Sequence, residues 1–397
     1  MPIPVFWDFS AAVAVLQLPR RSRVMSTRSA LEEHVSREVT RLCLAGLDPT
    51  TLRDAVVTSL GRAMPFEGYC SYETDPPTGL ITRTSLDHAD EQRRRFFLGH
   101  IYVNSEIYLH AWMKENHRLA FQDWTDSAPA PEHPGANRES LQSYAEFLSA
   151  MGVTGHLTGI FVAGGEMWGG VSLFRDGRAS AFPERDIALL GKLASRVGAG
   201  LKTSLLRELA GAHDPGQDAP GVLVLDRQGQ VVEYTPLAER WLGELIELGL
   251  DWRERSYLPD AIWAVAAALR RALAPQTERD EVTVPSVRVR GRSGRWLSLQ
   301  ASLTECSGDR AGDVVIVIGP AGPRELSWLR TSGYGLTARE QAVVEHVMRG
   351  ASTKQMADSL SISEYTVQDH LSHIFEKVGV RHRRALVKRL YLESWNT

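Results

Sequence analysis

The chain has 397 residues, which is enough for two or three domains. Hydrophobic residues make up 43% of it and charged residues 23%, and the net charge is −3 at pH 7, all ordinary values for a globular protein. No apolar run approaches the ~20 residues that span a bilayer, so we expect a cytoplasmic protein with no membrane partner.

The three cysteines, Cys43, Cys70 and Cys306, are scattered, without a CxxC pair or the spacing of metal ligands. This distribution argues for a reducing compartment and against a disulfide framework. Residues 1–25 need separate treatment. Their apolar run at 11–18 is followed, not preceded, by arginines, which is the reverse of a secretory signal. We expect a disordered arm here, or a true start at Met25.

Residues 26–210 alternate between helical and strand patterns. Apolar residues at helical spacing predict helices, and short alternating runs around Gly- or Pro-rich turns predict hairpins. The expected helices are 31–64 (broken at Asp48-Pro49), 91–117, 140–151 and 183–209, and the expected hairpins are 66–73 with 80–86 and 156–163 with 167–174. This order, with the terminal-helix pattern FPERDIALLGKLA, resembles a GAF domain, an α+β sensory module built on one antiparallel sheet.

The GAF resemblance implies a small ligand held between the sheet and its covering helices. Aromatic side chains that could form the wall of such a pocket are Tyr69, Tyr72, Trp112, Phe161 and Trp168. Aromatic residues at such positions are also common in ordinary cores. Four histidines, at positions 100, 110, 117 and 156, lack the spacing of a metal-ligand set, so we expect no metal and no cofactor.

The helix expected at 183–209 has an apolar stripe with steps of three and four residues. Its members are Ile187, Leu190, Ala194, Val197 and Leu201. A stripe close to a 3.5-residue repeat can pair with its copy in a second chain. The alternative is that it packs on the sheet of its own domain.

Residues 219–320 follow a linker-like stretch rich in Gly, Pro and Asp. Strands are expected at 221–232 (two, about a turn), 282–289, 295–303 and 313–319, with helices from 235 and at 260–273. The arrangement resembles a PAS domain, a second α+β module, and GVLVLDRQGQVVEYTPLAERWL is its best local match. No residue pattern in it specifies haem or flavin. Its expected role is dimerisation or relay.

Residues 332–397 contain three helix starts. Thr337 with Glu340 forms a capping box, Ser352 or Thr353 can cap a second helix, and Ser363 can cap a third. Apolar spacing predicts which side chains face inward: Ala342, Val343 and His346 or Val347; Met356, Ala357 and Leu360; and Val367, Leu371, Ile374 and Val378. The short turn at 361–363 suits the sharp crossing of a helix-turn-helix.

This stretch resembles the LuxR-type helix-turn-helix family, an all-α domain of four helices whose third helix enters DNA. The matching residues are Leu336, Thr337, Arg339, Glu340, Gly350, Ala357, Leu360, Ile362, Ser363, Thr366, Val367, His370, Leu371, Ile374, Lys377, Gly379, Val380 and Arg383. The resemblance also implies that residues 384–395 form a dimerising fourth helix. Its apolar side could equally cover the module's own small core.

Opposite the buried stripe, the third expected helix carries polar side chains. Residues near the N-terminus of such a helix reach base edges, whereas flanking cations hold phosphates. The candidate DNA-binding residues are Lys354, Thr366, Gln368, Asp369, Ser372, His373, Lys377, Arg381, Arg383 and Arg384. Residues 333–397 contain nine Lys and Arg and seven Asp and Glu, a net charge of +2. Because neutralisation of phosphates dominates DNA affinity, one copy of this stretch should bind DNA weakly.

The whole chain is therefore expected to be multidomain: an arm at 1–25, a GAF-like domain at 26–210, a PAS-like domain at 219–320 and the helix-turn-helix at 332–397. We expect a one-component, sequence-specific regulator that binds double-stranded DNA as a homodimer. Its GAF- and PAS-like region is expected to sense a small-molecule effector or to relay dimerisation to the helix-turn-helix. The alternative is a signalling protein that acts through protein contacts, with RNA polymerase as a candidate partner. An enzyme is disfavoured, because no Gly-rich phosphate loop, nucleophile elbow or HExxH motif is present.

Overall fold

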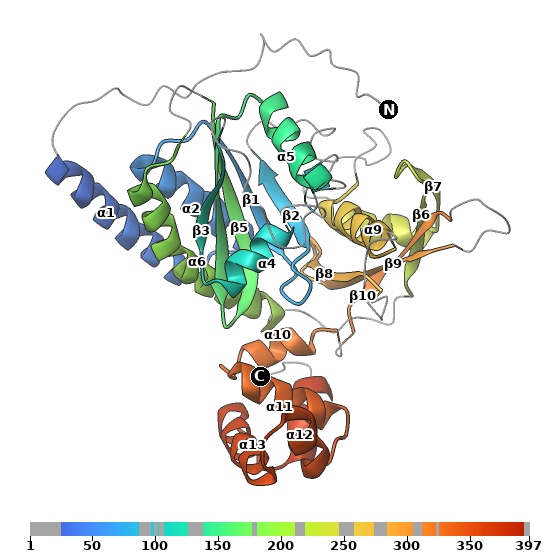
Figure 1. The fold of residues 1–397 in the computed structure, drawn as a ribbon. Coiled ribbons are helices and arrows are strands. Elements are labelled where there is room, and N and C mark those ends of the chain that lie inside the picture. The colour runs from blue at the N-terminus through green and yellow to red at the C-terminus, as the bar shows by residue number, and fades with distance from the viewer. Residues whose placement is uncertain are drawn as a thin grey trace.

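The structure is a computed structural model that describes residues 25–86, 97–98, 102, 107–125, 138–176, 181–210, 219–245, 258–273, 284–304, 312–322 and 325–392. Two β-sheets lie side by side, and an all-helical module lies below them (Figure 1). We refer to the described parts of 25–210, 219–320 and 333–392 as the first domain, the second domain and the C-terminal module. The expected arm at 1–25 lies almost entirely outside the described residues.

The first domain is a five-stranded antiparallel sheet with the order β2-β1-β5-β4-β3. Its strands are β1 (Gly68–Thr74), β2 (Ile81–Leu86), β3 (Ala120–Thr125), β4 (Gly155–Ala163) and β5 (Glu166–Arg175). Three helices cover one face: α1 (Met25–Leu44), α2 (Pro49–Ala63) and α6 (Glu184–Ala210). On the other face lie α4 (Ile107–Glu115) and α5 (Arg138–Ala150). Both expected hairpins are confirmed.

Strand β3 was not expected, because its sequence AFQDWT is short and only weakly alternating. It forms because the edge of β4 offers it a partner, with Ala120 opposite Gly159 and Phe121 opposite Thr158. The helix expected at 91–117 is confirmed over α4. Residues 91–96, 99–101 and 103–106 lie outside the described part.

The apolar stripe of α6 packs on the sheet of its own domain. Leu190, Ala194, Val197 and Leu201 are fully buried there. Leu190 lies so close to Gly159 of β4 that a Cβ on that glycine would come within 2.8 Å of its side chain. The alternative that this stripe packs within its own chain is therefore confirmed, and the stripe is not available for pairing with a second chain.

The second domain has another five-stranded antiparallel sheet, with the order β7-β6-β10-β9-β8. Counted within each domain, the two sheets have the same strand order. The elements are β6 (Gly221–Leu225), β7 (Val231–Tyr234), α7 (Pro236–Leu245), α9 (Asp260–Ala272), β8 (Ser286–Arg290), β9 (Trp296–Leu303) and β10 (Val314–Pro320). They agree with the expected strands and helices to within a few residues, except at 282–283, which lie outside the described part.

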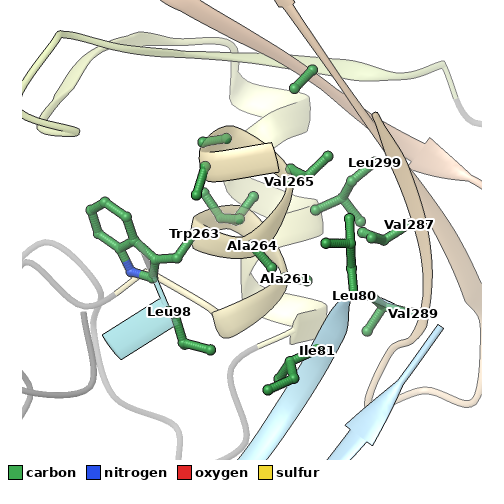
Figure 2. Close-up of a cluster of buried hydrophobic side chains, with 14 of the residues drawn as sticks. Leu80, Ile81, Leu98, Ala261, Trp263, Ala264, Val265, Val287, Val289 and Leu299 are labelled. Atoms are coloured by element: carbon green, nitrogen blue, oxygen red, sulfur yellow. The ribbon is translucent and has the colours of Figure 1, made fainter. Parts of the chain in front are cut away.

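The two domains share one hydrophobic core. Figure 2 shows Leu80 and Ile81 of the first domain beside α9 and near Val287 and Val289 of the second. At the N-terminus of α9, Asp260 Oδ2 accepts hydrogen bonds from the backbone N–H (2.6 Å) and the hydroxyl (2.8 Å) of Thr84 on β2. The domains therefore form one packed body.

A buried ion pair also joins these domains. Arg288 on β8 donates to both carboxylate oxygens of Asp75, at 3.0 Å and 2.5 Å. Asp75 begins the turn that connects β1 to β2, and the hydroxyl of Thr78 donates to it at 2.7 Å. The side chain of Asp75 is 0% exposed and that of Arg288 is 12% exposed, so the pair is largely removed from solvent.

The C-terminal module begins after a short helix, α10 (Ser327–Ser332), which lies within the expected linker. Leu326 and Leu329 of this segment join the core of the first domain, and α10 also contacts the last helical turn of the chain. The module itself comprises α11 (Ala338–Met348), α12 (Thr353–Leu360), α13 (Glu364–Val378), α14 (Arg383–Val387) and a final π-helical turn, η2 (Lys388–Leu392).

Candidate nucleic-acid interface

All three expected helix caps are present in the C-terminal module. The backbone N–H of Thr337 donates to the Glu340 carboxylate at 2.7 Å, and the Thr337 hydroxyl accepts from the Glu340 N–H at 3.3 Å. Ser352, not Thr353, caps α12, and it forms a second capping box with Gln355. Ser363 caps α13 by accepting from the Thr366 N–H at 3.0 Å. Each cap satisfies donors that the first helical turn leaves unpaired.

The turn between α12 and α13 consists of residues 361–363. Ser361 has φ +53°, a left-handed conformation that is unusual for a residue other than glycine. It ends α12 as its C-cap, and Ser363 begins α13 two residues later. This tight connection sets the crossing of the two helices. Gly350 and Gly379 follow α11 and α13 in the same conformation, as expected.

The buried stripe of α13 is confirmed. Val367, Leu371, Ile374 and Val378 are all at most 4% exposed and form the centre of the module's core. In α11 the expectation was partly wrong. Val343, Val344 and Val347 are buried, whereas Ala342 and His346 are only half-buried. Val344 was missed because two adjacent valines can both face a core that wraps around the helix.

The opposite side of α13 is open to solvent. Gln368, Asp369 and Ser372 are exposed, and Figure 1 places α13 on the part of the module away from the two sheets. The contacts on this side are exposed: the Ser372 hydroxyl donates to the Gln368 carbonyl at 3.0 Å, and the Gln368 side-chain amide donates to the Thr353 hydroxyl of α12 at 3.3 Å. His373 Nδ1 lies 3.9 Å from the Asp369 carboxylate. Amide, carboxylate and hydroxyl groups here can meet base edges without first breaking a buried contact.

The six other candidate residues divide into two groups. Lys354, Arg381 and Arg384 are exposed. In contrast, Thr366 is half-buried and its hydroxyl lies 2.8 Å from that of Ser363. Lys377 and Arg383 have hydrogen-bond partners within the module.

Arg383 and Lys377 connect helices of the module. Arg383 donates to the Ala351 carbonyl at 3.2 Å and to the Thr353 hydroxyl at 2.7 Å, which joins the start of α14 to the start of α12. Lys377 Nζ lies 2.6 Å from the Glu340 carboxylate, which joins α13 to α11. The structure therefore shows these two cations positioning the helices.

Glu340 should make the stability of the module sensitive to acid. Its side chain is buried, which by itself raises the pKa, but hydrogen bonds from Lys377 and Thr337 outweigh burial and hold the pKa of this carboxyl below its ordinary value. A depressed folded-state pKa contributes stability that is present above the unfolded pKa of about 4.3 and is lost as pH falls through the folded pKa.

We therefore expect the free energy of unfolding of the module to fall by about 1–3 kcal/mol below pH ~4, the worth of hydrogen bonds to a charged group. Urea titrations between pH 3 and pH 7 would measure this loss. Glu340→Gln should be less stable at pH 7 and should show a flatter pH dependence in this range. An unchanged pH dependence would contradict the role given to Glu340.

The five aromatic residues expected to form one pocket wall lie on two different faces of the first sheet. Tyr69, Phe161 and Trp168 face α1, α2 and α6, whereas Tyr72 and Trp112 belong to the core on the opposite face. Successive side chains of a strand point to opposite faces. Tyr69 and Tyr72 are three positions apart on β1, so they point to opposite faces and cannot line the same pocket. The interpretation of these five residues as a single wall is therefore wrong.

The face that carries Tyr72 also carries buried polar groups. The Tyr72 hydroxyl lies 2.9 Å from His110 Nε2, and the Tyr144 hydroxyl lies 2.6 Å from His156 Nδ1. Ser172 lies opposite Thr158 on the neighbouring strand, and both hydroxyls are buried without a hydrogen-bond partner among the described residues. Ser172 and Thr158 were missed because single Ser and Thr residues in apolar strands give no distinctive signal.

The described residues contain no group of three or more His, Cys, Asp or Glu side chains placed to hold a metal ion. Among them, no helix has both the length and the apolar character required to cross a membrane.

Comparisons with known proteins agree with the geometry of the C-terminal module. Residues 335–390 match a family profile described as "Bacterial regulatory proteins, luxR family". The spore germination protein GerE of Bacillus subtilis is 42% identical over 55 residues, which are 14% of this chain and 74% of that protein. The transcriptional regulatory protein DesR of B. subtilis is 36% identical over 73 residues, 18% of this chain but only 37% of DesR.

Among solved structures, the chain is similar to the GAF domain of a phosphoenolpyruvate-protein phosphotransferase from Coxiella burnetii. That match has 18% sequence identity and a TM-score of 0.29, and it covers 45% of this chain and 97% of the other. The two capping boxes, the left-handed turn and the buried stripe of α13 are found in the residues that match the profile. By these residues, the chain belongs to the luxR family of bacterial regulatory proteins.

Proposed function

We propose that this protein is a one-component transcriptional regulator in the cytoplasm that binds double-stranded DNA through its C-terminal module. One observation carries the proposal: the polar side of α13 is exposed and is not covered by the two N-terminal domains. A recognition helix must present this side to the major groove. The similarity of residues 335–390 to the luxR family supports the same assignment.

Base recognition is assigned to the outer side of α13. Gln368 can make paired hydrogen bonds to adenine, Asp369 can accept from a cytosine amine, and Ser372 can donate or accept. His373 lies at the edge of this surface. Lys354, Arg381 and Arg384 are assigned to phosphates, which position the module without reading sequence. Thr366, Lys377 and Arg383 contribute by holding the helices: Thr366 contacts the cap of α13, Lys377 joins α13 to α11, and Arg383 joins α14 to α12.

Binding is proposed to need two chains, because one module carries little net positive charge. A homodimer would present two copies of α13 to half-sites about one helical turn apart. If the three cations assigned to phosphates act in each module, a dimer neutralises six phosphates. The logarithm of affinity should then fall with the logarithm of salt concentration with a slope of about −5.

The effector is proposed to bind the first domain on the face that carries Tyr72. The buried hydroxyls of Ser172 and Thr158 support this choice, since an unsatisfied buried polar group costs about 1–3 kcal/mol and a bound molecule could satisfy it. The PAS-like second domain is assigned to dimerisation or relay.

Helix α10 is proposed to transmit the signal. The ring of Trp328 lies 5.9 Å from that of Trp168 on β5, and the guanidinium carbon of Arg288 lies 6.0 Å from the Trp328 ring. Just before α10, Glu325 accepts hydrogen bonds from the Ser298 hydroxyl and from the Gly322 N–H. Both N-terminal domains thus contact the segment from which the C-terminal module extends, so a rearrangement in either can reorient α13.

A gel-shift titration at several salt concentrations tests the proposal. Arg384→Ala should weaken binding to all sequences alike and make the salt slope shallower by about 2, because a dimer loses two phosphate contacts. Gln368→Ala should instead alter sequence preference and leave the slope unchanged. If no fragment of the source genome is bound, with or without cell extract, the proposal fails.

A second candidate function is signalling through protein contacts, with RNA polymerase as the partner. The acidic residues Asp369 and Glu376 on the exposed side of α13 favour it, because they repel phosphates. In that case DNA affinity would be weak and nearly independent of salt, and pull-down with RNA polymerase would require the same surface.

A further inference from the structure

The aromatic ring of Tyr365 projects into solvent from the first turn of α13. It is 83% exposed, the highest value among the exposed large hydrophobic side chains of the described residues. It has no hydrogen-bond or ring partner among those residues. The side chain therefore contributes little to the stability of the fold. Its position on the helix decides what it can contact in a bound partner.

Tyr365 belongs to the same outer side of α13 as the proposed base-reading residues. At 100° per residue it lies almost opposite the buried positions Val367 and Leu371. Residues four apart on a helix are neighbours, about 6 Å between Cβ atoms, so Tyr365 and Asp369 occupy adjacent positions on this surface. A helix that brings Asp369 to a base edge also brings Tyr365 to the same or the adjacent step.

The charges around Tyr365 disfavour a phosphate as its target. Glu364, Asp369 and Glu376 are all exposed on α13, and the only Lys or Arg of this helix, Lys377, is paired with Glu340. In the major groove, two features suit an apolar ring beside a carboxylate. They are the C5-methyl group of thymine and the N4 amine of cytosine, which lie on pyrimidine edges.

We infer that Tyr365 is a specificity-determining residue that contacts the methyl group of a thymine. This thymine lies next to the cytosine whose N4 amine donates a hydrogen bond to Asp369. This inference rests on the proposed function and adds a residue and a base to it. Uracil lacks the methyl group and pairs like thymine, so replacing one thymine by uracil removes this contact while leaving the hydrogen-bonding edges intact.

The test begins with selection of the preferred duplex from a random pool by the full-length protein. Each thymine of the selected site is then replaced by uracil, one position at a time in both half-sites, and affinity is measured by competition. For the unaltered protein we expect one thymine per half-site at which uracil lowers affinity about three- to ten-fold. Tyr365→Phe should behave in the same way, because it keeps the ring.

Tyr365→Ala should bind the thymine and uracil duplexes equally at that position. Because the side chain is exposed, the thermal unfolding midpoint should not change, which separates loss of contact from loss of fold. Uracil tolerated at every position would overturn the inference, as would equal uracil sensitivity in Tyr365→Ala. If Tyr365→Phe and Tyr365→Ala lost the same affinity for the selected duplex, the contact would belong to the hydroxyl, with a phosphate as its partner, and the inference would be overturned. Failure to enrich any duplex would refute the proposed function itself.

Discussion

Replacing Leu371 by alanine should unfold the C-terminal module while the two N-terminal domains remain folded. Leu371 is 2% exposed at the centre of the core shared by α11, α12, α13 and α14. Truncating a buried leucine to alanine costs about 2–5 kcal/mol, and a module of this size rarely has more than about 3–5 kcal/mol of stability. We expect limited proteolysis to remove the module of Leu371→Ala and to leave the N-terminal domains intact.

The neighbouring residue provides the control. Ser372 is exposed, and among the described residues its hydroxyl bonds only to the Gln368 carbonyl of its own helix. Ser372→Ala should keep the stability of the module within about 0.5 kcal/mol but weaken binding to the selected DNA site. The buried and exposed sides of α13 would be wrongly assigned if Leu371→Ala kept both its protease resistance and its DNA affinity.

Replacing Asp75 by alanine should loosen the junction between the two N-terminal domains. The substitution leaves the guanidinium of Arg288 at a largely buried site without the carboxylate that it contacts at 2.5 Å. Removing one partner of a buried pair costs about 3–5 kcal/mol, mainly because the remaining charge stays desolvated. Calorimetry should show a lower unfolding temperature, and the single transition of the joined domains should broaden or divide.

Two variants make this result specific. Asp75→Ala combined with Arg288→Met removes both charges and should recover much of the lost stability. Glu38→Ala removes an exposed pair, since Glu38 lies 2.6 Å from Arg62, whose side chain is 51% exposed. It should cost no more than about 1 kcal/mol. If Asp75→Ala and Glu38→Ala lowered the free energy of unfolding by the same amount, the Asp75–Arg288 contact would not have the importance given to it.

The C-terminal module was predictable because its determinants are local. The capping boxes of Thr337 and Ser352, the glycine after each of α11 and α13 and the stripe from Val367 to Val378 can be read within a few residues of each other. Helix propensity, capping and periodicity act over these short distances. The exposed polar side of α13 follows from the same periodicity.

The features that were missed depend on distant partners. Asp75 and Arg288 are 213 residues apart in the chain, so the sequence around either residue does not predict the ion pair. Strand β3 exists because β4 offers an edge, and the five aromatic residues were grouped without knowing which way each strand faced. The two faces of a sheet become distinct only when the register, such as Tyr72 opposite Gly170, is known.

The core that α9 shares with β2 limits how this regulator could be dissected or recombined. A fragment ending near residue 210 would lack α9, so the side chains of Leu80 and Ile81 would be exposed to water. A chimaera that exchanged only one of the two N-terminal domains would have to rebuild the same surface on the new part. Exchange of the N-terminal region among such regulators should therefore succeed when residues 26–320 are transferred together.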